Sequence, residues 1–361
     1  MDIFQLQSIT QNFLHELQDA YNGKKTSLPF IVHQISQNPI VGNGEDFKVF
    51  VIGGTQTKTA TLRKKENNIK ILDNKQNKVS FKTEEDFLSF TEDKIGKDIR
   101  VIALNFAYPM TPVFENGRLD GVLMAATKEG KFKDLVGKRI SREIENYVFK
   151  KRGQRINVSV GNDTICLLLS GLTHYPQDRL GAGIVGTGLN FALFLDKDKS
   201  VNLESANFDN FPQSTEGKGI DLKSDRPGKS LFEKETAGAY LYKHFNLMTK
   251  KRGIDYPKIS STEELDSLSR KNTPQISRIA QSLLERSAQL VACQVAGILR
   301  FAQNDKKSKS MVFNMEGSLF WKANSYKETV EKTVKQLIPK YNIRFVEIEN
   351  SAILGAAKLV S

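Results

Sequence analysis

The sequence predicts an α/β protein built from two lobes around a cleft. Three observations carry this prediction. The chain has 361 residues, more than one hydrophobic core usually supports. Strand-like and helix-like patterns alternate along it. A strand, a turn of glycine and threonine and a second strand occur twice, with the turns at residues 53–55 and 186–188, which indicates two similar lobes.

Composition excludes several classes of protein. Hydrophobic residues make up 39% and charged residues 26% of the chain, as a soluble protein with a proper core requires. The chain has no run of 18 apolar residues, so we expect no membrane span. Residues 1–19 lack the pattern of a secretory signal. Cys166 and Cys293 lie in apolar surroundings, as expected of buried thiols in a reducing compartment. We therefore expect a cytoplasmic protein with no membrane partner.

The net charge of +12 is compatible with nucleic acid, an anionic membrane or a polyanionic small substrate. Lysine pairs such as Lys64-Lys65 and Lys250-Lys251 are scattered, and no long basic block is interleaved with aromatic residues. This pattern favours a basic, solvated surface over a nucleic-acid partner. A nucleoside triphosphate is compatible with the charge, but the charge alone does not indicate one.

The first half of the chain predicts a helix followed by strands. Apolar residues three and four apart indicate an amphipathic helix over residues 2–21, which Gly23 ends. The further elements expected here are strands at 47–52, 57–62, 69–72, 100–106 and 156–160, helices at 84–95 and 136–151, and a loop at 119–133.

The second half is mostly helical after residue 231. A long stripe of alanine and leucine marks residues 276–301 as a buried helix. The other expected elements are strands at 180–185, 190–195, 311–314 and 344–348, and helices at 164–170, 233–247, 263–269, 326–337 and 352–360. We expect residues 1–46 to be an N-terminal helix and linker on the large lobe, 47–161 the small lobe with the C-terminal helix 353–361, and 162–352 the large lobe.

Asn162 and Asp163 follow directly on a β-branched strand. A polar pair between apolar flanks is either hydrogen-bonded or lines a cleft. One interpretation is a turn and a helix start, with Asn162 or Asp163 as the N-cap. The other interpretation is a catalytic carboxylate. The segment alone favours the turn and helix start, because such turns are common.

Glycine-rich turns and isolated polar residues form a second group of candidates. Gly53-Gly54-Thr55 and Gly186-Thr187-Gly188 expose backbone amides that suit a phosphate. Each match alone is weak, and the alternative is two ordinary hairpin turns. Amides and carboxylates suit a polyhydroxylated ligand. The polar candidates are Thr127, Lys128, Asn190, Glu204 and Glu233. Taken singly, Glu204 is better explained as a surface residue of an edge strand, and Glu233 as a charge at a helix N-terminus. No spacing of His and Cys predicts a metal site.

Three segments resemble motifs of the hexokinase/glucokinase family. Residues 226–241, RPGKSLFEKETAGAYL, are similar to the family's Asn-Pro-Gly-Lys-x-x-Phe-Glu-Lys-x-x-Ser-Gly-x-Tyr-Leu. Residues 184–190, IVGTGLN, resemble Ile-Gly-Thr-Gly-x-Asn, and residues 286–299 resemble the family's long helix. The order and the spacing both match, from about residue 28 to the C-terminus.

The resemblance implies a two-lobed actin-like ATPase fold, a duplicated ribonuclease-H-like α/β fold with a central cleft. It also implies phosphorylation of glucose or a related hexose at the 6-hydroxyl, by a monomer or homodimer that uses ATP and Mg²⁺ bound through the ATP phosphates. By position, Asp163 would be the general base, with Lys128 stabilising phosphoryl charge. The implied sugar ligands are Thr127, Lys128, Asn162, Asp163, Asn190, Glu204 and Glu233. The implied ATP contacts are Gly53, Gly54, Thr55, Gly186, Thr187, Gly188, Gly317, Ser318 and Gly355.

The sequence departs from the family on the nucleotide side. Val51 stands where the family's Asp-Leu-Gly-Gly-Thr has its carboxylate, and residues 351–355 replace Gly-Ser-Gly-Lys-Gly. Ala107 replaces the serine of Ser-Phe-Pro. Three hypotheses follow: an active hexokinase, a sugar-binding pseudokinase or regulator with impaired ATP use, and a basic protein associated with nucleic acid. The intact Asn162-Asp163 pair favours the first.

Overall fold

The structure, a computed structural model, describes residues 1–53, 57–66, 68–79, 81–125, 132–303 and 309–361. The chain divides into two compact units. Unit 1 holds residues 1–30, 183–191 and 203–346, and unit 2 holds residues 31–182, 192–202 and 347–361. The lobe boundaries expected from the sequence stay a prediction, and each unit is described separately.

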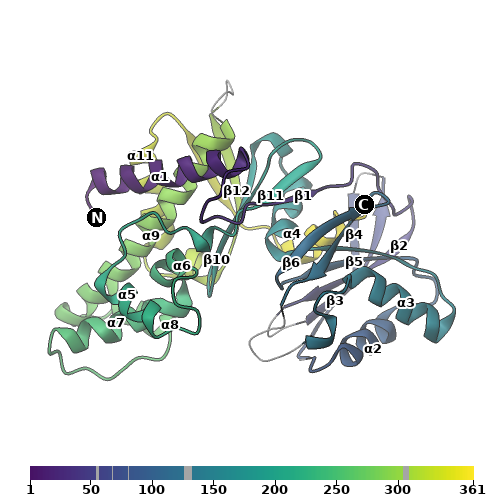
Figure 1. Ribbon diagram of the computed structural model, residues 1–361, viewed down its shortest axis with the longest axis horizontal. Helices are drawn as coiled ribbons and strands as arrows, with labels where there is room; N and C mark the ends of the chain where they lie inside the picture. Colours follow the sequence, from purple (N-terminus) through teal and green to yellow (C-terminus); the bar gives the residue numbers. More distant parts are fainter. Residues whose placement is uncertain (54–56, 67, 80, 126–131, 304–308) are drawn as a thin grey trace. The chain divides into compact units, whose positions relative to one another are not determined.

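Unit 2 is built on a five-stranded sheet of order β4-β3-β2-β5-β8 (Figure 1). Strands β2, β5 and β8 are parallel, and β3 and β4 extend the sheet as antiparallel strands. The strands are β2 (Asp46–Ile52), β3 (Thr57–Lys65), β4 (Asn68–Asn77), β5 (Val101–Phe106) and β8 (Asn157–Gly161). The β5 strand is buried on both faces, as its unbroken apolar sequence predicts for a central parallel strand.

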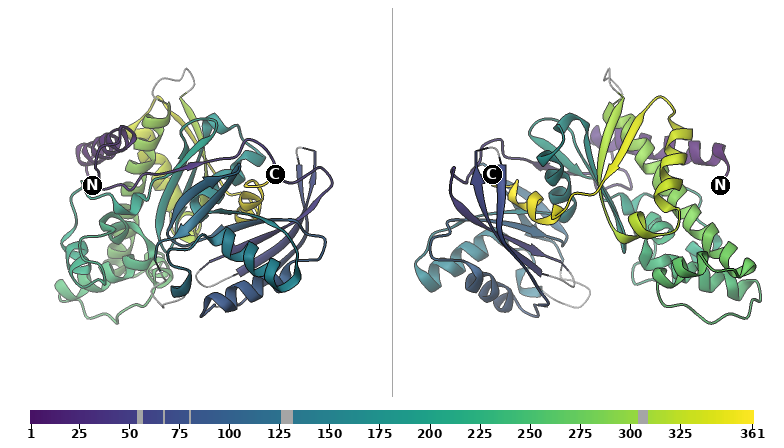
Figure 2. Two further views of the ribbon diagram at one scale, coloured as in Figure 1. Left: turned by 45° about the vertical axis from the view of Figure 1, so that its right-hand side comes forward. Right: turned by 180° about the vertical axis from the view of Figure 1, so that it is seen from behind.

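Helices cover both faces of this sheet. On one face, α2 (Glu84–Lys94) and α3 (Ile140–Arg152) pack on alternate residues such as Phe50, Ile52 and Leu104. On the other face lie α4 (Asp163–Ser170) and α12 (Ser351–Ala357), which contact each other and β5 (Figure 2). The unit also contains β1 (Ile31–Gln34) paired with β11 (Lys199–Asn202), and a hairpin of β6 (Met110–Glu115) and β7 (Arg118–Leu123).

Unit 1 is mainly helical and surrounds the 30-residue helix α9 (Pro274–Gln303). The amphipathic helix α1 (Ile3–Tyr21) packs on α9, where Gly297 leaves room for Phe13: a Cβ at this glycine would lie 2.7 Å from Cδ1 of the ring. The other helices are α5 (Thr215–Leu222), α6 (Leu231–Thr236), α7 (Gly238–Lys251), α8 (Thr262–Ser269), α10 (Ser318–Lys322) and α11 (Tyr326–Leu337). Parallel strands β12 (Ser310–Glu316) and β13 (Asn342–Val346) complete it. The sheet that includes them has the order β1-β11-β10-β9-β12-β13, with β9 (Leu180–Val185) and β10 (Leu189–Phe194).

Most expected elements are confirmed, and three differ for identifiable reasons. Residues 119–123 are not a loop but part of the β6–β7 hairpin, whose turn is Asn116-Gly117 with both φ angles positive, a strong hairpin signal. The helix expected from 136 begins at Ile140, because Gly137 N–H donates to Leu123 C=O at 2.8 Å and extends the hairpin. The helix expected over 233–247 is broken at Ala237, whose φ and ψ of −83° and 152° are extended. Strand β11 and helices α5 and α10 were not anticipated.

Candidate active site

Asn162 and Asp163 lie at the carboxyl end of β8 in unit 2. Asn162 is the N-cap of α4: its Oδ1 accepts hydrogen bonds from Thr164 N–H at 3.0 Å and from Asn202 Nδ2 at 3.3 Å. Asp163 begins the helix, and its Oδ1 accepts from the N–H of Thr164 at 2.7 Å and from its hydroxyl at 3.2 Å. The capping interpretation is therefore correct for Asn162. Asp163 is not the cap, and its carboxylate is held in place by the hydrogen bonds from Thr164.

The surroundings of Asp163 favour its protonated form. Burial raises the pKa of this carboxyl above its ordinary value, and the hydrogen bonds from Thr164 offset only part of the effect. Burial also raises the pKa of Cys166, with the nearby charge of Asp163 adding to it. A carboxylate that is desolvated in this way is a better proton acceptor than an exposed aspartate.

Gly161 and Gly355 have a packing role in unit 2. A Cβ at Gly355 would lie 1.7 Å from the carbonyl oxygen of Cys166, and one at Gly161 would lie 3.0 Å from its Sγ. Gly355 lets α12 approach α4 closely. Gly161 lets the end of β8 pack against Cys166 of α4. This contact accounts for Gly355 without a nucleotide, so its predicted ATP contact stays a prediction.

The first glycine-rich turn falls largely outside the described residues. Gly53 is described, and its carbonyl accepts a hydrogen bond from the Tyr108 hydroxyl at 3.2 Å. Gly54 and Thr55 of the same turn lie outside the described part of the chain, as do Thr127 and Lys128.

The second turn, Gly186-Thr187-Gly188, docks on the break between α6 and α7 in unit 1. Gly238 N–H donates to Gly186 C=O at 2.8 Å, and Ala239 N–H donates to Thr187 C=O at 3.1 Å. These bonds explain why the helix breaks at Ala237: the two amides bind the turn instead of continuing the helix. Gly238 is also required sterically, because its Cβ would lie 2.9 Å from the Gly186 oxygen.

Three predicted sugar ligands lie close to this turn. Glu233 contacts Gly188, where a Cβ would lie 3.0 Å from its Oε1. Two residues further along, Asn190 donates from Nδ2 to Glu204 Oε1 at 3.4 Å, and its Oδ1 accepts from Ser205 N–H at 3.3 Å. Glu204 has a left-handed backbone with φ 49°. Such a conformation costs about 1–3 kcal/mol for a non-glycine residue and is concentrated at functional sites.

Two buried charged residues, Lys234 and Glu235, follow Glu233 in α6 and fix this helix. The Glu235 side chain, 0% exposed, pairs with Arg286 Nη2 of α9 at 3.0 Å. It also accepts from the N–H and the hydroxyl of Ser214 at 2.7 and 2.9 Å. Lys234 pairs with Asp221 of α5 and donates to Arg226 C=O at 2.8 Å. The carboxylate of Glu233 is thus placed by ion pairs to two other helices.

Replacing Arg286 with glutamine is expected to lower the free energy of unfolding by about 3–5 kcal/mol, because it leaves the Glu235 charge buried without its cation. Urea unfolding measures the loss. Lys24→Gln is the matched control, since its 2.7 Å pair with Asp19 is exposed to solvent and is worth about 0–1 kcal/mol. Equal losses in the two variants would show that Arg286 does not hold α6 in place.

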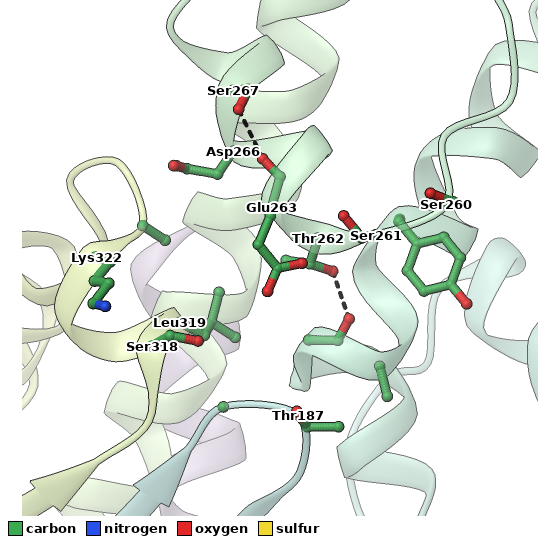
Figure 3. Close-up of a pocket in the computed structure, with 15 residues that line it drawn as sticks. Thr187, Ser260, Ser261, Thr262, Glu263, Asp266, Ser267, Ser318, Leu319 and Lys322 are labelled. Carbon is green, nitrogen blue, oxygen red and sulfur yellow. Dashed lines mark hydrogen bonds between the residues drawn. The ribbon is translucent and has the colours of Figure 1, made fainter. Parts of the chain in front are cut away.

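A pocket of about 390 Å³ opens beside the Gly186-Thr187 turn in unit 1 (Figure 3). This volume is within the range of small-molecule sites. Figure 3 shows the side chain of Glu263 pointing from α8 into the pocket. The lining residues are Gly186, Thr187, Gly238, Ala239, Tyr242, Ser260, Ser261, Thr262, Glu263, Asp266, Ser267, Ser318, Leu319, Lys322 and Ala323.

The pocket brings together two segments, Gly186-Thr187 and Ser318, that the family resemblance predicts to contact ATP. Gly317 packs so closely against the turn that a Cβ there would lie 2.2 Å from the carbonyl oxygen of Val185. Its φ angle of 120° also favours glycine. Ser318 then lines the pocket together with Thr187. The wall formed by residues 260–267 was not predicted as part of a site. Its run of serine, threonine and glutamate indicates only a helix start, and Ser261 does cap α8.

The described residues contain no group of three or more His, Cys, Asp or Glu side chains placed to hold a metal ion. Within the same residues, no helix combines the length and the apolar character needed to cross a bilayer.

Comparisons with known proteins identify the relatives of this chain. A family model described as hexokinase matches residues 248–361. Hexokinase-1 of Saccharomyces cerevisiae is 22% identical, with 99% of this chain and 88% of the relative covered. The hexokinase of Kluyveromyces lactis is 24% identical, with 98% and 87% covered.

Solved structures of hexokinases share the fold. The hexokinase from Schistosoma mansoni, complexed with glucose, has a TM-score of 0.80 at 18% identity and covers 100% of this chain and 95% of its own. A ROK family glucokinase from Streptomyces griseus, in complex with glucose and AMPPNP, has a TM-score of 0.56 at 14% identity and covers 88% and 99%. The predicted resemblance to the hexokinase/glucokinase family and the predicted two-lobed actin-like fold are confirmed.

Proposed function

We propose that this homologue of the hexokinases is a hexose kinase that transfers the γ-phosphate of ATP to the 6-hydroxyl of glucose or a related hexose. The full-length similarity to hexokinases supports the enzyme class. Solved relatives with glucose, and with glucose and AMPPNP, support the two substrates.

The observation that carries the proposal is the setting of Asp163. Its carboxylate stands at the end of a parallel strand, is held through one oxygen by Thr164, and has a pKa raised by burial. In the proposed reaction it accepts the proton of the 6-hydroxyl while the sugar oxygen bonds to the γ-phosphorus. The bond from that phosphorus to the bridging oxygen breaks, and ADP leaves.

The polar residues that do not react would bind the sugar. Asn190 and Glu204 form one hydrogen-bonded pair, and Glu233 is held beside Gly188. Carboxylate and amide groups of this kind each bond a hydroxyl, and a sugar that lacks the hydroxyl leaves them unpaired. Asn162, Thr127 and Lys128 complete the proposed set by position in the family.

The nucleotide would occupy the pocket beside the Gly-Thr-Gly turn. Thr187 and Ser318 offer hydroxyls there, and the turn presents backbone close to the ligand because it lacks side chains at two of its three positions. Mg²⁺ bound to the ATP phosphates would supply charge neutralisation, and oxygen-bearing side chains such as those found here suit this hard cation. We keep a cytoplasmic location as a prediction.

One observation favours a second candidate, a sugar-binding pseudokinase. Val51 occupies the position of the family's carboxylate on β2, and loss of such a group lowers metal-site function by roughly 10–100-fold. The same sugar ligands would remain in place in this alternative.

Hexose-dependent release of ADP tests the proposal. Purified protein with Mg²⁺, ATP and glucose is expected to release ADP, and 6-deoxyglucose is expected to bind without supporting release, because it lacks the reacting oxygen. Glucose binding without ADP release from any hexose would establish the pseudokinase instead.

The pH dependence of kcat/KM should report the raised pKa of Asp163. Since the base acts when ionised, the rate is expected to fall as pH drops through a pKa above the usual value of about 3.9 for aspartate. Glucose affinity measured over the same pH range shows whether the fall in rate comes from protonation of Asp163 or from weaker sugar binding. A rate that stays constant down to about pH 4 contradicts the assignment.

A further inference from the structure

The pocket beside the Gly186-Thr187 turn has two acidic side chains on one wall, and the protein itself binds only one of them. Asp266 Oδ1 accepts a hydrogen bond from the Asn324 N–H at 2.6 Å, and the same carboxylate pairs with Arg270 at 3.1 Å. Glu263 points into the pocket (Figure 3), and among the described residues its carboxylate has no hydrogen bond or ion pair. Asp266 therefore has a structural role, whereas the oxygens of Glu263 face the space that a ligand would fill.

Hydrogen bonds hold Glu263 in a defined position relative to the turn. The preceding residue, Thr262, donates from its hydroxyl to the Gly238 carbonyl oxygen at 2.5 Å, as a dashed line in Figure 3 shows. Gly238 N–H donates in turn to the Gly186 carbonyl oxygen at 2.8 Å. Glu263 thus extends from a helix start that Ser261 caps and that is tied to the turn through one residue. The Glu263 carboxylate and the turn consequently lie on different walls of one pocket.

Charge decides which part of a nucleotide lies against Glu263. A carboxylate and a phosphate repel each other at short distance, so the triphosphate belongs at the turn, where Thr187 and Ser318 offer hydroxyl donors. The part of the ligand that reaches Glu263 must then be uncharged and must donate hydrogen bonds, because an ionised carboxylate only accepts them.

The ribose meets this requirement better than the base. Its 2′- and 3′-hydroxyls are adjacent donors that match the two oxygens of one carboxylate, and acidic residues bind a ribose hydroxyl in dinucleotide-binding folds. Adenine sets its amino group beside a ring nitrogen that accepts, an arrangement that suits a side-chain amide and not a carboxylate.

We propose that Glu263 accepts hydrogen bonds from the 2′- and 3′-hydroxyls of the nucleotide ribose and makes this chain selective for ribonucleotides over deoxyribonucleotides. This role rests on the proposed function, which places the nucleotide in the same pocket. A ribose without its 2′-hydroxyl leaves one carboxylate oxygen without its donor. Because hydrogen bonds to a charged acceptor are stronger than those between neutral groups, the loss should weaken binding about 10-fold.

Binding of ADP and of 2′-deoxy-ADP, measured by calorimetry with Mg²⁺, tests the proposal without turnover. The wild type is expected to bind ADP about 10-fold more tightly than 2′-deoxy-ADP. Glu263→Ala removes both hydrogen bonds, so its affinity for ADP should fall by at least about 10-fold. The ratio of its affinities for the two nucleotides should fall to about 1, since alanine cannot distinguish them.

Glu264→Ala is the matched control. Glu264 follows Glu263 in the same first turn of α8 and carries the same charge. Its carboxylate instead accepts a hydrogen bond from the Ser260 hydroxyl at 2.5 Å, and it lies outside the pocket lining. This substitution should leave the ratio of the two affinities unchanged.

Three results would overturn the proposal: ADP binding by Glu263→Ala as tight as by the wild type, an unchanged ratio of affinities in that variant, or no ADP binding by the wild type. Failure of the wild type to phosphorylate any hexose would instead overturn the proposed function. The ratio measured with ADP and 2′-deoxy-ADP would still decide the role of Glu263 in that case.

Discussion

Replacing Asp163 with asparagine is expected to lower kcat by at least about 10²–10⁴-fold, the usual contribution of a positioned base. Asparagine has nearly the same shape and can still accept the hydrogen bonds from Thr164, but it takes no proton from the sugar. The expected pattern is therefore a large loss of turnover with glucose affinity retained, measured by ADP release and by calorimetry with glucose.

Stability provides the control for this variant. The pKa of Asp163 is higher in the folded chain than in an unfolded one. The stabilising contribution of the protonated form is present below the unfolded pKa and is lost as pH rises through the folded one. At neutral pH the asparagine removes a partly buried charge, so the free energy of unfolding should not fall. Turnover equal to that of the wild type would contradict the role of Asp163 as the base.

Gly355→Ala is expected to lower the free energy of unfolding by at least about 3 kcal/mol, at the upper end of overpacking effects. The added Cβ would lie 1.7 Å from the Cys166 carbonyl oxygen, so α12 must move away from α4. Thermal and urea unfolding measure the change.

The same substitution at Gly219 is the matched control. Gly219 is helical, and a Cβ there meets Leu247 Cδ1 at 3.9 Å, an ordinary contact. Gly219→Ala is therefore expected to stabilise the chain slightly, by about 0.4–1 kcal/mol. If Gly355→Ala kept full stability and lost only nucleotide affinity, Gly355 would be a ligand contact and the packing explanation would be wrong.

Much of the fold was accessible from the sequence, because periodicity reflects local burial. The strands at 47–52 and 180–185 and the long helix at 276–301 were all predicted from apolar spacing alone. The break at Ala237 was not, since it depends on Gly238 and Ala239 binding a turn 50 residues earlier in the chain. No local sequence pattern predicts that long-range contact.

The candidate site shows the same division. The family resemblance implied that the Gly-Thr-Gly turn and Gly317-Ser318 contact one nucleotide, and the structure places Thr187 and Ser318 in one pocket. The opposite wall at residues 260–267 carries only the pattern of a capped helix. Gly355 shows the converse difficulty: a glycine in a nucleotide-like motif has a packing role that becomes visible only when α12 is seen against α4.

Phosphorus-31 NMR of a reaction with glucose and Mg²⁺·ATP tests the central claim most directly, because it identifies the acceptor of the phosphoryl group. The wild-type chain is expected to convert the γ-phosphate signal into a phosphomonoester coupled to the protons on carbon 6 of the sugar, while Asp163→Asn leaves ATP intact. Intact ATP in the wild-type reaction with glucose bound, or phosphate released to water at the same rate by both proteins, would contradict the assignment of a hexose kinase that uses Asp163 as its base.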